Sequence, residues 1–512
     1  MPLAERVIRY VRMHGAAYTL RRAGEMFRER ALRSYDRQCR RSDPSGEELA
    51  RQRGSQPQAG LISVAIPAYN TRPVFLRELT DSLTAQTYEN WEAVIFDGGS
   101  TDAEAVAAMD SLTDSRIRVV HSPVNAGISG NTNAAIRLCR GDYVALCDHD
   151  DTLTPDALWH VAHAISREHP DMLYSDEDKL TEDGRIRTDP HRKPDFSPDN
   201  LRSGNYVCHL TVIRRALLEE LGGLRPDFDG SQDHDLVLRV TERTQRICHI
   251  PRVLYHWRTV GASMSHQRLA QCQDAAARAV TEHMRRIGYP GACTVEDGVL
   301  RLRYEVNKAL SLRVIHVPQG ERYAWMNQAA ASAEEDVLLF VDSSVTKLSD
   351  GVEQELLMYA QRDDVGAVTP MLTDARGRVT HAGFALTAED VICRNAGLPY
   401  HAGGWHGMNR TSHNVAAVSA ACLMIRRDHF VPFDESWQDG LGAVDWCLRL
   451  AQQGLRCVYT PHARAVCTDA ALLRRWSELA RLRSAWPEWR DPCSGFTHSP
   501  SSGAMLGTKE EI

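Results

Sequence analysis

The stretch LISVAIPAYNTRPVFLRELTDSLTAQTYENWEAVIFD, residues 61–97, decides the fold class of the chain. Its two ends, 61–69 and 91–97, are apolar and rich in residues that favour strands. Between them, residues 72–87 place their apolar side chains at helical spacing. A helix that joins two strands in a unit of this length makes the strands parallel. We therefore predict an α/β fold built on a mainly parallel sheet.

Further strands are predicted at 116–120 and 143–148. Asp97 and Asp148 each end a strand, and the turn at 67–70 follows the first strand. Ligands of an open parallel sheet bind at the carboxyl ends of its strands. We therefore expect these residues to meet at one edge of the sheet, where a ligand binds.

The segment LCDHDDTL, residues 146–153, places three aspartates directly after a buried strand. Carboxylates this close repel one another unless a cation or a proton lies between them. Oxygen ligands spaced D-x-D suit Mn²⁺ or Mg²⁺, ions that also bind phosphates. A solvated loop, or a helix start at 152–155, explains the same acids, because carboxylates favour helix N-termini. The acids thus predict a divalent cation that bridges a diphosphate, with those two alternatives open.

Seven segments within residues 60–265 carry a resemblance to a known family. They are VAIPAYN (64–70), SLTAQTYENWEAVIFDGGSTD (82–102), NAGISGNTNAAI (125–136), GDYVALCDHDDTL (141–153), YSDEDK (174–179), GSQDHDLVLR (230–239) and IPRVLYHWR (250–258). On these segments the chain resembles family 2 glycosyltransferases of the GT-A fold. The resemblance implies a Rossmann-like, mainly parallel catalytic domain with a nucleoside-diphosphate sugar as donor and Mn²⁺ or Mg²⁺ as cofactor.

The resemblance also implies roles for individual residues. Asp233 would be the catalytic base, and Gln232 before it replaces the glutamate that is more usual in the family. The residues implied to bind the metal are Asp148, Asp150 and His256. Those implied to bind the nucleotide are Pro67, Tyr69, Asn70, Asp97 and Asp148. Those implied to contact the acceptor or the donor sugar are Asp176, Glu177, Asp178 and Gln232.

Three of these positions have a plainer explanation that the sequence leaves open. Asp233 is placed to cap the helix that follows it. His256 fits a structural histidine packed beside Trp257, and residues 176–178 fit a solvated loop. For each of these positions the sequence therefore leaves two explanations open.

The implied reaction transfers a sugar, with inversion, from a nucleoside-diphosphate sugar to a hydroxyl of a glycan or lipid-linked glycan. Such a step belongs to the synthesis of a surface polysaccharide such as O-antigen. A non-catalytic scaffold that binds a nucleotide-sugar or a glycan is the alternative. A nucleotidyltransferase is disfavoured, because residues 67–71, PAYNT, stand where its glycine-rich and basic phosphate loop is expected.

The second part of the chain repeats the first weakly. At an offset of 194, Asn133 aligns with Asn327 and Asp148 with Asp342, and at 210 Asp235 aligns with Asp445. The candidate functional residues are not repeated: Asp150, Asp233 and His256 align with Ser344, Ala443 and Val466. The repeat also has no counterpart of residues 61–102. We predict a truncated, degenerate GT-A-like second domain, which binds an acceptor or a partner or is only structural.

These observations divide the chain into four parts. They are a basic helical extension and linker (1–58), the catalytic domain (59–292), the degenerate domain (300–470) and a C-terminal helix with a disordered tail (471–512). Residues 1–41 hold eleven arginines against four acids, which predicts either peripheral contact with anionic lipid or packing on the catalytic domain.

Composition limits the remaining functional classes. The net charge of -7 gives no argument for nucleic-acid binding. The 13 cysteines are scattered and form no zinc or disulfide pattern, which favours a reduced, cytoplasmic setting. No apolar run approaches the roughly 20 residues that span a bilayer. The expected location is the cytoplasm, with the inner face of the cell membrane as the peripheral alternative.

Overall fold

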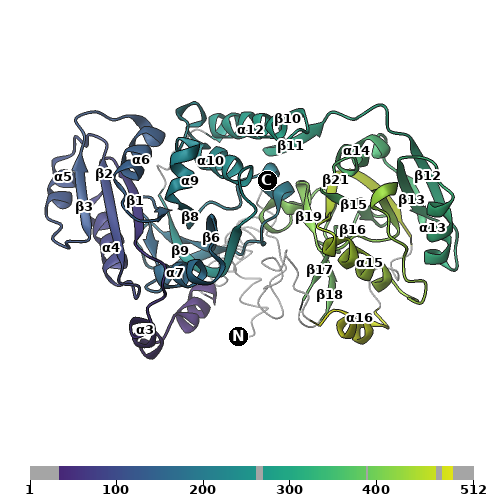
Figure 1. The fold of residues 1–512 in the computed structure, drawn as a ribbon, viewed down its shortest axis with the longest axis horizontal. Helices are drawn as coiled ribbons and strands as arrows, with labels where there is room; N and C mark the ends of the chain where they lie inside the picture. The colour runs from purple at the N-terminus through teal and green to yellow at the C-terminus, as the bar shows by residue number, and fades with distance from the viewer. Residues whose placement is uncertain (1–33, 261–268, 388–389, 469–475, 488–512) are drawn as a thin grey trace, which may run out of the picture.

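The computed structural model describes residues 34–260, 269–387, 390–468 and 476–487. The chain forms two halves, each built on its own large sheet, which lie left and right in Figure 1. We call residues 34–259 the first half and residues 312–467 the second half. Helix α12 (Leu269–Arg286) and the hairpin of β10 (Gly291–Glu296) and β11 (Val299–Tyr304) join them along the top of Figure 1.

The first half contains a nine-stranded, mainly parallel sheet, so the predicted fold class is confirmed. Its order is β3-β2-β1-β4-β8-β6-β9-β5, with β7 paired to β6. The antiparallel members are β8, β7 and β5. The strands are β1 (Ile62–Ala68), β2 (Trp91–Asp97), β3 (Ile117–His121), β4 (Tyr143–Leu146), β5 (Thr152–Leu153), β6 (Met172–Thr181), β7 (Arg187–His191), β8 (Thr211–Arg214) and β9 (Ile247–Thr259).

Helices cover both faces of this sheet, because successive side chains of a strand point to opposite faces. In β1, Val64 and Ile66 pack with α4, α5 and α7, whereas Ala65 packs with α6, α9 and α10. The helices of this half are α3 (Gly46–Arg53), α4 (Pro73–Thr84), α5 (Ala103–Asp110), α6 (Gly127–Leu138), α7 (Ala157–Glu168), α8 (Pro198–Ser203), α9 (Arg215–Leu221), the 3₁₀ turn η1 (Pro226–Phe228) and α10 (Gln232–Thr241).

The second half repeats the order and the strand directions of the first sheet from β1 onward. Its order is β12-β13-β20-β15-β21-β14, so that β12 corresponds to β1 and β13 to β4. No described strand lies beyond β12, where the first half has β2 and β3. The strands are β12 (Leu312–Val317), β13 (Val337–Asp342), β14 (Val345–Leu348), β15 (Val365–Thr373), β16 (Val379–His381), β17 (Phe384–Leu386), β18 (Val391–Cys393), β19 (His413–Val415), β20 (Cys422–Arg426) and β21 (Arg456–Cys467). The helices are α13 (Arg322–Ala331), α14 (Val352–Ala360), η2 (Trp405–Arg410), η3 (Arg427–His429), α15 (Leu441–Gln452) and α16 (Leu479–Ala485).

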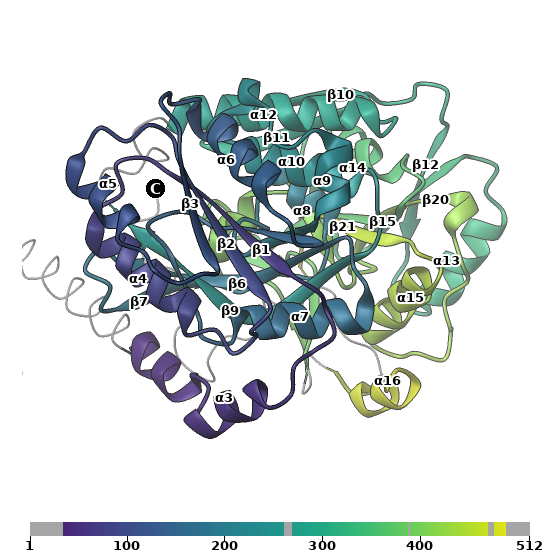
Figure 2. The same cartoon turned by 60° about the vertical axis from the view of Figure 1, so that its left-hand side comes forward.

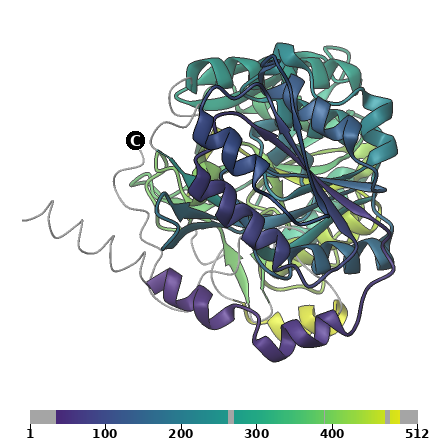
Figure 3. The ribbon, with the colours of Figure 1, turned by 90° about the vertical axis from the view of Figure 1, so that its left-hand side faces the viewer.

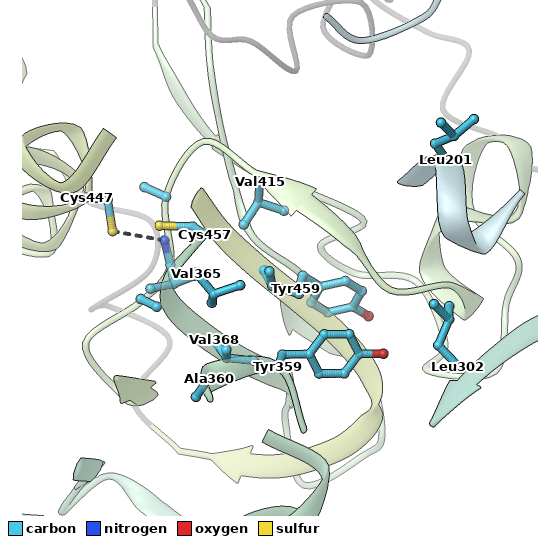
Figure 4. Packing of buried hydrophobic residues seen from close by; sticks show 14 of the residues in the cluster. Leu201, Leu302, Tyr359, Ala360, Val365, Val368, Val415, Cys447, Cys457 and Tyr459 are labelled. Carbon is cyan, nitrogen blue, oxygen red and sulfur yellow. Dashed lines mark hydrogen bonds between the residues drawn. The ribbon is translucent and has the colours of Figure 1, made fainter. Parts of the chain in front are cut away.

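One apolar cluster runs through both halves. It includes Val144 and Leu236 of the first half and Val368 and Val415 of the second. Figure 4 shows Leu201, from α8, across from the second-half strands that carry Val415 and Tyr459. Because apolar burial is the main favourable term in folding, the two halves stabilise each other.

Two local predictions were wrong. Residues 46–53 of the predicted linker form α3, purple and below the strands in Figure 3, which Ser45 caps by accepting a hydrogen bond from the Glu48 amide. Residues 152–155 do not begin a helix: Thr152–Leu153 is strand β5, and α7 begins at Ala157. The acids at 148–151 are therefore not helix caps.

Several predictions about the ends of the chain concern residues outside the described ranges. The lipid-binding helix falls mostly on residues 1–33, and the disordered tail on 488–512. Just inside the described ranges, Tyr35 contacts Asp178 and Asp43 contacts Arg187. All twelve cysteines of the described ranges are free. None of the described helices is long and apolar enough to cross a membrane.

Candidate active site

The strand ends predicted to meet do lie at one edge of the first sheet. Ala68 of β1 is paired in register with Asp97 of β2, and Ala65 with Leu146 of β4. Asp148 follows β4 by two residues. The carboxyl ends of three neighbouring parallel strands therefore carry the residues of this site.

Asp97 and Asn70 are joined through Ser100. The buried Asp97 Oδ1 accepts hydrogen bonds from the Ser100 amide (2.9 Å) and hydroxyl (2.5 Å), while Ser100 Oγ accepts one from the Asn70 amide (2.8 Å). His121 Nδ1 lies 2.7 Å from Asp97 Oδ2, and hydrogen bonding to Asp97 raises the pKa of His121. Two of the predicted nucleotide residues, Asp97 and Asn70, thus form one bonded unit at the edge.

The turn after β1 is held in an unusual backbone conformation. Asn70 has φ 48°, in the left-handed region that asparagine tolerates better than most residues. Its side-chain oxygen accepts hydrogen bonds from the amides of Thr101 (2.8 Å) and Asp102 (3.0 Å). Pro67 is half-buried in β1, and Tyr69 is exposed at the tip of the turn. An exposed aromatic ring beside fixed polar groups suits contact with a planar ligand.

Three potential metal-ligating side chains converge after β4. Among the described residues, ligand atoms of Asp148, Asp151 and His209 all lie within 4.8 Å of one another. His209 Nε2 is 3.8 Å from Asp148 Oδ2, and its ring stacks on that of Tyr255 at 4.6 Å. Two carboxylates and one imidazole form a donor set that divalent cations accept.

Asp151 is the buried member of this group. Its carboxylate accepts hydrogen bonds from the Tyr255 hydroxyl (2.5 Å) and from the Arg258 amide (2.6 Å). The same Tyr255 oxygen accepts a hydrogen bond from the Asp148 amide at 3.1 Å. Tyr255 thereby ties the two acids to one another.

The acids at this edge are short of positive charge. Burial raises the pKa of Asp150 and Asp151, and the charge of Asp148 raises both further. The nearby guanidinium of Arg258 is bound to Glu78 at 2.5 Å, and its other hydrogen bonds go to the backbone oxygens of Asp150 (2.6 Å) and Glu182 (3.2 Å). A bound cation would relieve this repulsion.

His209 was not found by sequence reasoning. It lies 61 residues after Asp148, in no recognisable spacing, and reaches the acids because β8 pairs antiparallel with β4, with Thr211 opposite Leu146. A signal for it would have required the order of the strands.

Asp233 is in the first turn of α10, but it is not the cap, because the helix begins at Gln232 and Ser231 holds the N-cap position. Its Oδ2 accepts a hydrogen bond from Asn205 Nδ2 at 2.8 Å. Gln232 turns back, and its Oε1 accepts a hydrogen bond from the Gly230 amide (2.8 Å). The capping explanation for Asp233 is therefore wrong.

His256 faces Asp178 instead of the acid group. Its Nδ1 lies 2.6 Å from Asp178 Oδ1, and the other oxygen of Asp178 accepts the Tyr35 hydroxyl at 2.9 Å. Both His256 and Asp178 are buried in paired strands, where Thr152 of β5 lies opposite His256. His256 therefore makes a contact between two buried strands, and His209 is the histidine that lies beside the acids.

Residues 176–178 are not a solvated loop, because they lie buried in β6. Asp176 accepts hydrogen bonds from the Lys193 amide and His249 Nε2, both at 2.9 Å. Burial opposes ionisation of Glu177, but Lys193 and His191 outweigh it and lower its pKa. Glu177 also accepts the His209 amide at 3.0 Å, so this acid supports the histidine of the site.

The equivalent edge of the second half differs in its charges. Asp342 aligns with Asp148, but its Oδ2 accepts a hydrogen bond from Arg322 Nε (2.8 Å) and its Oδ1 accepts the Ser344 hydroxyl (2.6 Å). An arginine therefore neutralises Asp342 within the protein. Ala443 and Val466, opposite Asp233 and His256, supply neither a base nor a ligand.

Part of the chain matches a known protein family, and most of the chain is similar to known proteins. Residues 63–222 match the family described as Glycosyl transferase family 2. The chain is 32% identical over 519 residues to Uncharacterized protein y4gI of Sinorhizobium fredii, covering 87% of this chain and 56% of that protein. It is 31% identical over 522 residues to O-antigen biosynthesis protein RfbC of Myxococcus xanthus, covering 87% of this chain and 40% of that protein. The structure of S. aureus TarS 1-349 with UDP-GlcNAc is 19% identical, with a TM-score of 0.37, and the match covers 44% of this chain and 66% of that chain. The chain thus spans 56% of the length of the first of these relatives and 40% of the length of the second.

Proposed function

We propose that the chain, whose residues 63–222 match glycosyltransferase family 2, moves a sugar, with inversion, from a nucleoside-diphosphate sugar to a hydroxyl of a growing surface polysaccharide. The observation that carries this proposal is the group of Asp148, Asp151 and His209 at the sheet edge that also holds Asp97. The similarity to an O-antigen biosynthesis protein supports the class of product. A glycan or lipid-linked glycan is the proposed acceptor.

The residues at the edge fit a divalent cation. We propose Asp148, Asp150, Asp151 and His209 as its binding group, and His256 only as a support through Asp178. Carboxylates with an imidazole suit Mn²⁺, with Mg²⁺ as the harder alternative. A bound cation would neutralise charge on the departing diphosphate.

Asp233 is the proposed catalytic base. A carboxylate takes a proton from the acceptor hydroxyl as that oxygen attacks the anomeric carbon. The hydrogen bond from Asn205 fixes one oxygen of Asp233. The other oxygen is then oriented for the acceptor, and a single displacement inverts the sugar.

The donor nucleotide is assigned to the other side of the edge. Asp97 and Asn70, linked by Ser100, would bind the base, with Pro67 and Tyr69 beside the base and ribose. Asp148, which follows β4, is the member of the cation group next to this unit, because β4 lies beside β1. The order of these groups along the edge matches that of base, ribose and diphosphate in a nucleotide.

We propose that residues 59–292 act as the catalytic domain and that residues 300–470 carry no second active site. The hydrogen bond from Arg322 to Asp342 supports this. Arg322 already neutralises the acid that aligns with Asp148, so this acid is not available to bind a cation. Contact of residues 1–41 with the inner face of the membrane stays a prediction. Sedimentation with anionic vesicles, with and without these residues, tests it.

A scaffold that binds a nucleotide-sugar without turnover is the alternative. Thermal unfolding of the whole chain with a panel of UDP-, dTDP- and GDP-sugars, each with and without Mn²⁺, identifies the donor, because ligands that bind the folded state stabilise it. Release of nucleoside diphosphate on adding glycan acceptors then separates enzyme from scaffold. Stabilisation without release favours the scaffold, and absence of any Mn²⁺-dependent stabilisation contradicts both.

A further inference from the structure

The two halves meet at one segment that also reaches the candidate active site. We define the bridging segment as residues 191–209, which runs from the end of β7 through α8 to the residue pair before β8. It carries Asn205, the partner of Asp233, and His209, the neighbour of Asp148. We propose that contacts from the second half hold the bridging segment and thereby position Asn205 against Asp233. This inference rests on the proposed function for the role of Asp233.

A buried ion pair between the halves holds the middle of the bridging segment. Both terminal nitrogens of the Arg362 guanidinium donate to Asp199, with Nη2 at 3.2 Å from Oδ2, and both side chains are almost fully buried. Burial opposes ionisation of Asp199, but Arg362 and Arg202 outweigh it and lower its pKa. Removal of Arg362 would leave Asp199 with Arg202 (3.2 Å) as its remaining described ion-pair partner, which is unfavourable for a buried charge.

Asn414 of β19 adds a second bond set at the same place. Its Nδ2 donates to Asp199 Oδ2 at 2.8 Å, and its Oδ1 accepts from the Asp199 amide (3.0 Å) and the Ser197 hydroxyl (3.1 Å). The hydroxyl of Ser203 donates to the Ser412 carbonyl at 2.6 Å. Residues of the second half therefore form hydrogen bonds at both ends of the six-residue helix α8.

A separate element of the second half holds the start of the bridging segment. The ring of His406, in η2, stacks on that of His191 with 4.4 Å between centroids. His406 Nε2 also lies 3.3 Å from the Pro190 carbonyl oxygen. Because η2 and β19 act at different points, the segment is fixed in direction as well as in place.

The fixed segment contacts the first half next to the proposed base. The Leu201 carbonyl accepts a hydrogen bond from His234 Nε2 at 2.7 Å, one residue after Asp233. Asn205, two residues after Ser203, donates to Asp233 itself. Figure 2 shows α8 between helix α9 and strand β21 of the second half. Asn414, Asp199 and Asn205 are thus positioning residues, and displacement of α8 would move the partner of the base.

The test uses hydrogen–deuterium exchange of the whole chain without ligand. In Arg362→Met, peptides spanning 197–209 and 230–236 should exchange at least about tenfold faster, because local opening there becomes easier. The matched control is Arg322→Met. It removes the arginine partner of a different buried aspartate, Asp342, which lies in the second half. The control should raise exchange near 322–344 and leave 197–209 unchanged.

Asn414→Ala serves as the second variant, because it removes one amide and keeps the ion pair; it decides the question if Arg362→Met does not fold. Unchanged exchange in 197–209 in the folded variants, or an equal rise in Arg322→Met, would overturn the proposal. In transfer assays, Asn414→Ala should lower kcat about tenfold with the donor KM unchanged. Asn414→Asp, which replaces the amide donor to Asp199 by a second carboxylate, should lower kcat at least as much. The exchange result needs no donor, so it stands apart from a failure of the proposed activity.

Discussion

Asn133 and Asn327 make the same pair of hydrogen bonds in the two halves of the protein. Asn133 donates to the Leu224 carbonyl and accepts the Leu224 amide, each at 2.8 Å. Asn327 does so with Phe433, at 2.9 and 2.7 Å. The likeness of the two halves therefore extends from strand order to individual side chains.

We expect Asn133→Ala and Asn327→Ala to destabilise the protein by similar amounts. Each leaves a backbone amide and carbonyl without partners, which costs about 1–3 kcal/mol for buried groups, and these sites are half-buried. Urea unfolding of both variants measures the change in the free energy of unfolding. A loss at one position with none at the other would show that the two bond pairs are not equivalent.

Asp150 and Asp342, which lie at the equivalent edges of the two halves, should differ in function. Asp150→Asn removes a proposed cation ligand, so we expect sugar transfer to fall by at least about 100-fold and Mn²⁺-dependent stabilisation to be lost. Asp342→Asn should leave transfer within about twofold, because Arg322 occupies that site and any effect acts on stability. Transfer that survives Asp150→Asn but not Asp342→Asn would place the active site in the second half.

Asp233→Asn should separate binding from catalysis. The amide keeps the shape and the contact with Asn205 but cannot take a proton, so kcat should fall by about 10²–10⁴. Donor binding should not change, since the nucleotide residues lie elsewhere along the edge. Isothermal titration of the donor and single-turnover transfer measure the two quantities. Weaker donor binding with normal turnover is the result that rules out a base.

Stabilisation by Mn²⁺ should increase with pH. The pKa of Asp150 and Asp151 is raised in the folded protein, so folding without metal loses stability as pH rises through the unfolded pKa toward the folded one. Cation binding requires ionised carboxylates and a neutral imidazole. The rise in Tm with Mn²⁺ should therefore be small near about pH 5 and large near about pH 8. Asp150→Asn should flatten this dependence, and an increment that is constant with pH contradicts it.

The sequence predicted the elements whose signals are local. The strands and helix of 61–97 follow from their apolar spacing, and the repeat at offset 194 was visible through Asn133 and Asp148. Helix α3 was missed although Ser45 and Glu48 have the spacing of a capping box. A charged, polar composition concealed it.

The contacts that complete the site depend on strand order, which the sequence does not display. His209 meets Asp148 only because β8 lies beside β4, and Arg322 meets Asp342 only when α13 packs against β13. Residues 176–178 resembled exposed acids, because their partners lie 14 to 78 residues away. These partners are His191, Lys193, His249 and His256. The kind of site could be predicted from its residue types, whereas the pairs of side chains that contact one another could not.

The shared apolar cluster has a consequence for dissecting the protein. A fragment that ended between the hairpin and β12 would expose Leu201 and its neighbours to water and would lack Arg362 and Asn414, two partners of the Asp199 carboxylate. Such a fragment would be prone to precipitate, however intact its sheet. Crystallisation, fusion or domain-exchange designs should treat both halves as one inseparable folding unit.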